Sequence, residues 1–536
     1  MLAVLSASEQ PTPGLVGRKD ELDGRSAVRP LALVREHDRT VLLLEDPGGE
    51  PFDRLRQLHE PGLIHKDIKP VNVLVNSVTG QVWLTGFVIA SCLPRERQSG
   101  AAITRGGGRR SAMFATSTSV PTFASRALLF AALVLPWAAT QAPGAEPIKV
   151  GLSIALTGGI APIGKQLLLG LEIWRDDLNA KGGLLGRPVE LTHYDDQSNA
   201  SLVPGIYTKL LNVDKVDLLL GPYGTNMIAP AMPVIMQQDK MTIGLLGVNI
   251  NRQFNYSRYF STIPGGDEGA LAFSRGWFEI AMAQTPKPKT VAIVAADAEF
   301  GRIACDGARD NAKKSELNIV YDKSYPPFST DLMPVVRAIA ATNPHLIFVC
   351  AYPPDTVAFV RAAAETNLNA MMWGGSMVGM LSSTIKMQLG PLLNGVVFME
   401  NFPPSPKLDF PGLKEVLAKY QAKAPSLGTD PLGYANVPFA YAAGQVLAKA
   451  VADTKSLDHA KLADYIHATS FPTVAGELSF GQDGEWKKSR QFVTQFQNIT
   501  GNDLSQFRDT IRQVILWPAE YKTGKIIYPY QEAKKK

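Results

Sequence analysis

The first residues that could do chemistry are Gly224-Thr225-Asn226, a small polar triplet between an apolar run and a helix-like segment. Backbone N–H groups at the start of a helix have no partner inside the helix and favour anions. A carboxylate would sit well there, although Thr225 could also simply cap its helix, and the two roles are compatible. Phe300 and Tyr352, on two later loops, could stack against a bound molecule or fill the core. The pair Asp195-Asp196 could hold a metal or exchange protons, but a helix cap and a solvated charge explain it better.

Catalytic signatures are otherwise missing from the sequence. The chain has no G-x-S-x-G, no P-loop and no G-x-G-x-x-G. Its seven histidines are scattered without metal-ligand spacing, at His37, His59, His65, His193, His345, His459 and His467. We therefore predict a protein without catalysis, without a cofactor and without a bound metal.

Strand-like apolar runs alternate with helix-like segments from Ile148 onward. The expected strands are 148–155, 189–194, 216–220, 241–246, 290–295, 319–324, 346–350 and 490–498. The expected helices are 164–180, 202–213, 228–238, 269–283, 300–317, 332–341 and 355–366. This alternation is typical of the α/β class and predicts two doubly wound lobes with parallel sheets. In such sheets ligands bind beyond the carboxyl ends of the strands, where Gly224-Thr225-Asn226 lies.

Composition and charge fit an ordinary soluble globular protein. The 536 residues are 45% hydrophobic and 19% charged, and the net charge of +5 is mild. The local basic clusters at 105–110 and 534–536 are read as solvated tails, so no nucleic-acid partner is expected. Of the three cysteines, Cys305 and Cys350 could be two buried thiols, or could pair if their Cα atoms come within about 7 Å.

A secretory signal is indicated in the middle of the chain. Arg126 precedes an apolar run, 127–139, and small residues up to Ala145. The run is shorter than the roughly 20 residues that a membrane span needs. We expect export to the periplasm if translation begins near Met113, where the signal becomes N-terminal, and retention in the cytoplasm if it begins at Met1.

The segment 64–75 resembles the catalytic loop of protein kinases, with Asp67 at the place of the proton-accepting Asp and Asn72 at the place of the magnesium-holding Asn. Gly86 stands where that family has its second metal-binding Asp. The resemblance is to a truncated, degenerate kinase-like domain of bacterial hybrid signalling kinases, over residues 1–97. No Gly-rich loop or strand lysine accompanies it, and fewer than 100 residues do not form two kinase lobes. We expect no kinase activity, then a disordered linker over 98–125 and the signal segment over 126–145.

Five segments of the remaining chain resemble the leucine/isoleucine/valine-type periplasmic binding proteins of ABC transporters: 148–152, 156–159, 179–187, 194–197 and 220–225. The resemblance covers 146–530 and implies a type I periplasmic binding protein, with two lobes joined by three crossovers. It implies one ligand-binding lobe from 146–264 plus 400–480 and another from 265–399 plus 481–536. The hinges are expected near 263–266, 399–402 and 477–484.

The same resemblance implies a set of ligand-binding residues. These are Tyr223, Thr225, Leu246, Gly247, Asn249, Phe300, Tyr352 and Ser376. Thr225 takes the place of the hydroxyl that binds the ligand carboxylate, and Leu246 the place of the carbonyl that accepts from the amine.

Three positions depart from the family pattern. Val248 replaces a ligand-contacting Thr, Ser376 replaces the Glu that balances the ligand ammonium, and Ile163 replaces a cleft aromatic. Burying an ammonium without its carboxylate costs several kcal/mol. The departures therefore favour a carboxylate, an amide or a urea-like solute over a branched-chain amino acid, unless Asn249, Asp297 or Glu299 substitutes.

The expected function is the extracytoplasmic solute-binding component of a branched-chain-amino-acid-type ABC importer, which captures an amino acid or a related small carboxylate or amide between two lobes and delivers it to the permease. The protein is expected to act as a monomer. A ligand-sensing receptor or regulator of the same fold is the alternative, and the absence of an output domain after 526–536 favours transport. An enzyme acting through the kinase-like segment is the third interpretation.

Overall fold

The computed structural model describes residues 146–266 and 268–534, together with the backbone of five strands among the first 84 residues. Those strands are β1 (Leu2–Ser6), β2 (Pro30–Glu36), β3 (Arg39–Leu44), β4 (Val73–Val75) and β5 (Val82–Leu84). They form an antiparallel sheet of order β1-β3-β2 and an antiparallel pair β4-β5. The expected kinase-like residues Asp67, Asn72 and Gly86, the linker and the signal segment lie outside the described residues. The chain divides into two compact units, Met1–Leu133 and Val134–Lys536, and the rest of the description concerns the second.

The first sheet of this unit is wholly parallel, in the order β10-β9-β8-β6-β7. Its strands are β6 (Ile148–Ile154), β7 (Val189–Asp195), β8 (Leu218–Tyr223), β9 (Thr242–Leu245) and β10 (Tyr259–Ser261). The connecting helices are α1 (Ala161–Ala180), α2 (Val203–Asn212), α3 (Thr225–Gln237) and α4 (Ile250–Phe254). Strand β6 is almost wholly buried, as a parallel strand covered on both faces must be.

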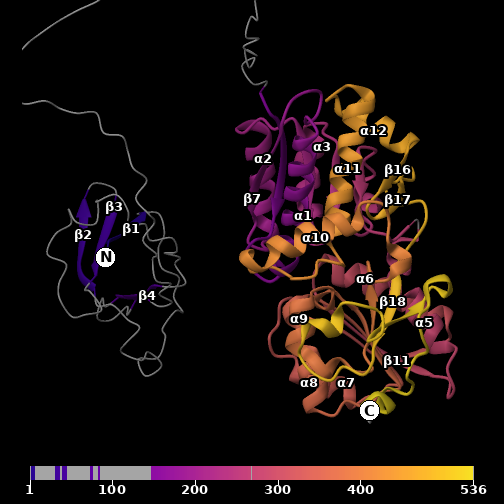
Figure 1. Ribbon diagram of the computed structural model, residues 1–536. Helices are drawn as coiled ribbons and strands as arrows, with labels where there is room; N and C mark the ends of the chain where they lie inside the picture. Colours follow the sequence, from indigo (N-terminus) through magenta and orange to yellow (C-terminus); the bar gives the residue numbers. More distant parts are fainter. Residues whose placement is uncertain are drawn as a thin grey trace, which may run out of the picture. The chain divides into compact units, whose positions relative to one another are not determined.

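Helices from much later in the chain complete this part of the fold. They are α10 (Leu413–Lys423), α11 (Val437–Thr454) and α12 (His459–Ala468), followed by the hairpin β16 (Ser470–Thr473) and β17 (Gly476–Ser479). Figure 1 shows these orange elements beside the magenta ones. Helices α1 and α11 pack closely because Gly444 leaves room for Trp174: a Cβ on Gly444 would stand 2.2 Å from the Trp174 ring.

The second sheet has the order β12-β11-β13-β14-β15-β18-β19 and is mixed rather than wholly parallel as expected. Its parallel strands are β11 (Thr290–Ala296), β12 (Asn318–Tyr325), β13 (Leu346–Ala351), β14 (Met372–Met377) and β15 (Val397–Glu400). Strands β18 (Phe492–Phe496) and β19 (Gln513–Trp517) add to it in antiparallel pairing. The chain reaches β18 by the return crossing and β19 by a connection that turns back within the same sheet, so neither belongs to a β-α-β unit.

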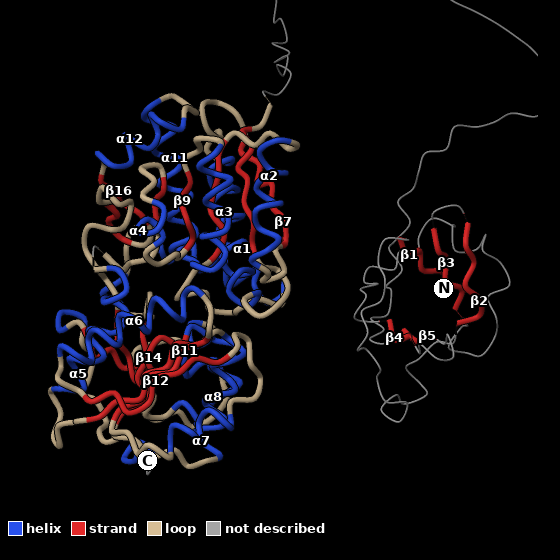
Figure 2. The backbone as a smooth tube through the Cα atoms, turned by 180° about the vertical axis from the view of Figure 1, so that it is seen from behind, coloured by secondary structure: helices blue, strands red, loops and turns tan. Residues whose placement is uncertain are grey.

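Helices cover both faces of the second sheet, as Figure 2 shows from behind. They are α5 (Ala272–Met282), α6 (Glu299–Lys314), α7 (Met333–Ala340), α8 (Pro353–Glu365), α9 (Ser383–Leu389) and α13 (Tyr530–Lys534). Short 3-10 turns link the elements: η4 (Ala200–Leu202), η5 (Gly269–Leu271), η6 (Val378–Leu381), η7 (Gly390–Leu393), η8 (Pro406–Leu408), η9 (Ala424–Leu427), η10 (Leu504–Phe507) and η11 (Ala519–Tyr521). The two covered sheets confirm the α/β class. Among the described residues, each helix is too short or too polar to cross a bilayer.

The chain passes between the two sheets three times. It leaves β10 toward η5, returns after β15, and passes again between β17 and β18. The third passage lies later than the expected 477–484, because Gly484 still accepts a hydrogen bond from the Ser261 N–H of β10 (2.9 Å). The Arg490 N–H then donates to Pro264 O (2.9 Å), so the first and third passages lie side by side.

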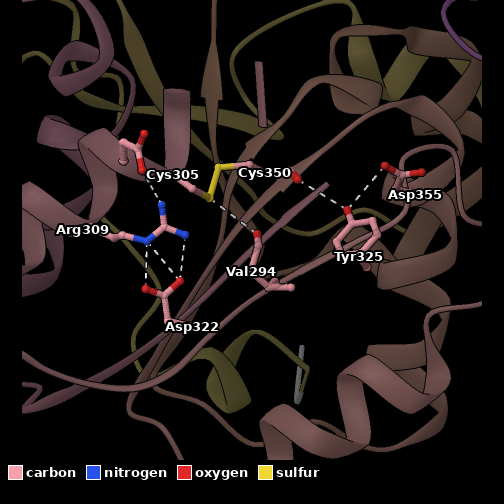
Figure 3. Close-up of a disulfide and its surroundings, with 8 residues drawn as sticks. Val294, Cys305, Arg309, Asp322, Tyr325, Cys350 and Asp355 are labelled. Atoms are coloured by element: carbon pink, nitrogen blue, oxygen red, sulfur yellow. Dashed lines mark hydrogen bonds and ion pairs between the residues drawn. A yellow bond between two sulfur atoms is a disulfide. The ribbon is translucent and has the colours of Figure 1, made fainter. Parts of the chain in front are cut away.

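A disulfide joins Cys305 of α6 to Cys350 of β13, with their Cα atoms 6.2 Å apart (Figure 3). Both residues are fully buried, which fits either of the two sequence alternatives. The structure selects the pair, because β13 lies beside β11 and α6 packs over both strands. The disulfide thus fixes the helix that begins at Glu299 to the strand that ends before Tyr352.

Candidate functional site

The turn between β8 and α3 presents an unusual helix start. Strand β8 runs to Tyr223, beyond the expected end at Leu220, and Gly224 has φ +83°. Helix α3 begins at Thr225, three residues before the expected start. No side chain caps it, so capping by Thr225 is wrong. The N–H groups of Thr225 and Asn226 donate to no other described residue. Two N–H donors therefore face outward from the positive end of a helix dipole.

The Thr225 hydroxyl is held in place at this turn. Its oxygen accepts a hydrogen bond from the Val248 N–H (3.0 Å), and the residue is only 1% exposed. A hydroxyl that already accepts keeps its own proton to donate. Thr225 can therefore add a third donor to the two backbone N–H groups.

A cavity of about 20 Å³, called the inner cavity, lies at the carboxyl ends of strands from both sheets. Its lining residues are Tyr223, Gly224, Thr225, Asn226, Leu246, Ile263, Phe273, Phe300, Tyr352, Val378, Leu381, Met399 and Asn401. The volume holds about one water molecule. The lining includes no Asp, Glu, Lys, Arg or His.

The fold brings five of the eight expected site residues to this cavity: Tyr223, Thr225, Leu246, Phe300 and Tyr352. It does not bring Gly247, Asn249 or Ser376 there.

Each of these three residues is engaged or enclosed elsewhere. Gly247 is tied to β10 by its carbonyl, which accepts from the Ser261 hydroxyl (2.8 Å). Asn249 directs its amide toward Gly269, where an added Cβ would stand 1.8 Å from its Oδ1. Ser376 is fully buried in β14. Ile163, expected at the cleft, is also fully buried and lines no described cavity.

The acidic residues offered as substitutes for the missing Glu are both engaged by the same arginine near the surface. Arg302 pairs with both Glu299 (2.9 Å) and Asp297 (3.5 Å). Neither carboxylate lines the inner cavity. No carboxylate among the described residues therefore faces the place where an ammonium would be buried.

Tyr352 stands at the start of α8 among aromatic rings. Its ring centroid lies 5.1 Å from that of Phe328 and 6.1 Å from that of Phe300. Its backbone N–H donates to Asp355 Oδ2 (3.2 Å), which also accepts from the Tyr325 hydroxyl (3.4 Å; Figure 3). Burial raises the pKa of the Asp355 carboxyl to about 7. Burial also raises the pKa of Tyr352 far above its usual value, so its hydroxyl stays protonated.

Sequence reasoning missed Asn401, which follows β15 in the second passage between the sheets. It is 2% exposed, and its Oδ1 has no hydrogen-bond partner among the described residues. The Glu400 carboxylate fixes the backbone here by accepting from the Asn401 N–H (3.0 Å). No sequence motif marks this residue, so only the folded chain shows that it reaches the inner cavity.

A larger space of about 840 Å³, called the outer cavity, lies between the loop 156–162 and the start of α8. The half-buried Phe328 ring contacts one residue of each cavity. It packs against Tyr352 of the inner cavity. It also packs against Gly159 of the outer cavity, where an added Cβ would stand 2.5 Å from the ring. Phe328 thus connects the two sheets across the space between them.

The paired carboxylates Asp195 and Asp196 hold the loop that lines the outer cavity. Asp195 accepts from the Leu156 N–H (2.9 Å) and the Thr157 hydroxyl (2.8 Å), and Asp196 accepts from the Ser153 hydroxyl (2.8 Å). Their role is therefore structural. Within 146–266 and 268–534, no group of three or more His, Cys, Asp or Glu side chains could hold a metal ion.

Comparison with known proteins agrees with this architecture. The sequence profile of a family described as periplasmic binding protein matches residues 147–498. The Leu/Ile/Val-binding protein of Escherichia coli K12 is 24% identical over 345 residues, which span 64% of this chain and 89% of that protein.

Two solved structures share the fold. One is a branched-chain amino acid transporter substrate binding protein from Streptococcus pneumoniae in complex with isoleucine (18% identity, TM-score 0.55, 67% of this chain and 97% of that one). The other is an ABC transporter solute binding protein from R. palustris in complex with benzoate (18% identity, TM-score 0.57, 69% and 95%). The family profile spans well over half of the sequence, and the chain accordingly belongs to the periplasmic binding protein family.

Proposed function

We propose that this protein captures a small carboxylate or amide between two lobes in the periplasm and delivers it to the permease of an ABC importer. The lobes are those expected from the sequence, 146–264 with 400–480 and 265–399 with 481–536, except that the residues up to Gly484 stay with the first lobe. Family membership and the cavity at the strand ends of both sheets support this function. The observation that carries the ligand class is the start of α3, where three donors meet at the inner cavity.

The donor set at Thr225 and Asn226 suits a carboxylate or an amide oxygen. Charge-assisted hydrogen bonds to an oxyanion are about twice as strong as neutral ones. The helix dipole adds to them, and the buried surroundings reduce screening by water. Leu246, Phe273 and Phe300 form an apolar wall that would cover the rest of the solute.

A zwitterionic amino acid fits this site poorly. Its ammonium would be buried without a carboxylate, which costs several kcal/mol. Neighbours of this fold bind isoleucine in one case and benzoate in another. The fold accommodates both kinds of solute, and the side chains lining the cavity of this chain favour the second kind.

Solute entry requires the lobes to part. The inner cavity holds about one water, whereas small-molecule sites commonly occupy about 300–1,000 Å³. The three passages between the sheets can act as hinges, and the solute stabilises the closed form because it contacts both lobes. The Phe328–Gly159 contact belongs to that closed form.

Calorimetric titration of the purified full chain with leucine and with 4-methylpentanoate tests this proposal, because the two differ only by the ammonium. We expect 4-methylpentanoate to bind at least tenfold more tightly. Thr225→Val should weaken its binding, since it removes a donor, while Thr208→Val should not, since Thr208 lies on the exposed side of α2 and donates to Pro204 O. Tighter binding of leucine would refute the assigned ligand class.

A further inference from the structure

Two polar atoms of the inner cavity have no hydrogen-bond partner among the described residues: the Tyr352 hydroxyl oxygen and Asn401 Oδ1. Tyr352 is 3% exposed and Asn401 is 2% exposed, so bulk water does not solvate them. Buried polar groups in folded proteins nearly always have a partner, because leaving one unsatisfied is costly. Two such groups on residues that line the same small cavity call for a polar group from outside the chain.

The two groups offer complementary chemistry. Burial keeps the Tyr352 hydroxyl protonated, and its proton remains to be donated. The Asn401 amide oxygen accepts. A group that accepts from one and donates to the other satisfies both, and a hydroxyl is the smallest group that does so.

We propose that Tyr352 and Asn401 together recognise a neutral hydroxyl group on the solute, so that the preferred ligands are hydroxylated carboxylates. This inference rests on the proposed function, and it concerns the end of the solute that does not meet α3. It makes Asn401 a specificity-determining residue.

The charges around Asn401 are already compensated, which favours a neutral group there. Glu400 Oε2 accepts from Gln513 Nε2 (2.8 Å) and lies 3.4 Å from Lys386 Nζ, while its Oε1 accepts from the Asn401 N–H. Lys386 in turn donates to Gln513 Oε1 (2.9 Å). Neither Glu400 nor Lys386 lines the inner cavity, so neither an ammonium nor a second carboxylate of the solute would meet an opposite charge.

The same network holds Asn401 in a fixed position for recognition. Its backbone is fixed by a carboxylate that is itself held by two side chains from α9 and β19. A site built to bond a hydroxyl rejects the analogue that lacks it far more strongly than an apolar pocket rejects a missing methylene. The presence or absence of the hydroxyl should therefore change affinity sharply.

The test is the ratio of dissociation constants for benzoate and 4-hydroxybenzoate, and for 3-phenylpropionate and 3-(4-hydroxyphenyl)propionate, measured by calorimetry on the full chain. We expect the wild type to prefer the hydroxylated member of at least one pair by tenfold or more. Tyr352→Phe and Asn401→Leu should each reduce that ratio to within about threefold of unity. Tyr321→Phe, on β12 outside both cavities, should keep it.

The outcomes separate the two proposals. Binding of both members with equal affinity overturns the hydroxyl inference and leaves the carboxylate site standing, with water as the partner of Tyr352 and Asn401. Failure of every tested carboxylate, including 4-methylpentanoate, to bind overturns both the hydroxyl inference and the proposed function. The wild-type ratio alone decides the question if a variant does not fold, and circular dichroism of each variant identifies that case.

Discussion

The buried ion pair of Lys386 and Glu400 allows the sharpest prediction on stability. The side chains are 7% and 1% exposed, and Gln513 bonds to both of them. The Lys386 ammonium also lies 5.9 Å and 5.8 Å from the ring centroids of Phe398 and Phe496. We consider Lys386→Met, which keeps most of the length of the side chain and removes its charge.

The expected cost follows from the charge that remains. Removing one partner of a buried pair typically costs about 3–5 kcal/mol, because the other charge stays buried without compensation. Glu400 retains Gln513 and the Asn401 N–H as donors, so we expect the lower part of this range, about 3 kcal/mol. The double variant Lys386→Met/Glu400→Gln leaves no buried charge, so it should cost less than the sum of the two single changes.

Urea denaturation followed by circular dichroism and tryptophan fluorescence measures the free energy of unfolding, and coincidence of the two curves tests whether the lobes unfold together. The matched control is Lys449→Met, whose partner Asp453 lies 2.7 Å away on the same helix with both side chains exposed. We expect the control to change stability by less than about 0.5 kcal/mol. A cost below about 1 kcal/mol for Lys386→Met, or strict additivity in the double variant, would refute the assigned role of the pair.

Three further predictions concern other parts of the fold. The pKa of Asp355 is about 7 in the folded protein, against the ordinary 3.8. Between these pH values the folded state holds a proton that the unfolded chain releases. The free energy of unfolding should therefore fall as pH rises from about 4 to 7, by at most about 4 kcal/mol. Asp355→Asn should flatten that pH dependence in denaturation curves, and an unchanged slope would contradict the assignment. Cys305→Ser should lower the free energy of unfolding by about 2–4 kcal/mol under oxidising conditions. Reduction with dithiothreitol should lower the stability of the wild type to that of the variant. Equal stability of the two proteins before reduction would count against the disulfide. Gly444→Ala should lower the free energy of unfolding by at least about 1 kcal/mol, because the added Cβ meets the Trp174 ring. Gly205→Ala in α2, where an added Cβ meets nothing within 4 Å, should raise it by about 0.5 kcal/mol. Similar effects from both variants would be inconsistent with the packing described.

The sequence pattern predicted most elements up to residue 366 and their ends less well, and of the later elements it predicted only the strand at 490–498. The apolar run of β6 and the regular β-α alternation were enough to predict covered sheets. The start of α3 was placed three residues late, because the apolar periodicity begins near Ile228 while the positive φ of Gly224 sets the true start. The antiparallel β18 and β19 belong to a mixed sheet, since a strand reached by a crossing can pair in either direction.

The candidate site was predicted in part because strand ends are visible in a sequence and side-chain directions are not. Thr225, Phe300 and Tyr352 follow strands, and the fold brings them to one cavity. Ser376 lies within β14, enclosed by its neighbours, and so does not reach the cavity. Local pattern does not encode the pleat and twist that decide this.

By itself, the sequence determined the α/β class, the family resemblance and the absence of a family Glu at Ser376, because these depend on residue types and spacing along the chain. Only the tertiary structure decided that Cys305 and Cys350 pair and that Asn401 reaches the inner cavity without a partner. Each of these depends on contacts between different secondary-structure elements or lobes of the fold. Such contacts form only when the hydrophobic effect packs the sheets and helices together, and local sequence pattern does not specify them.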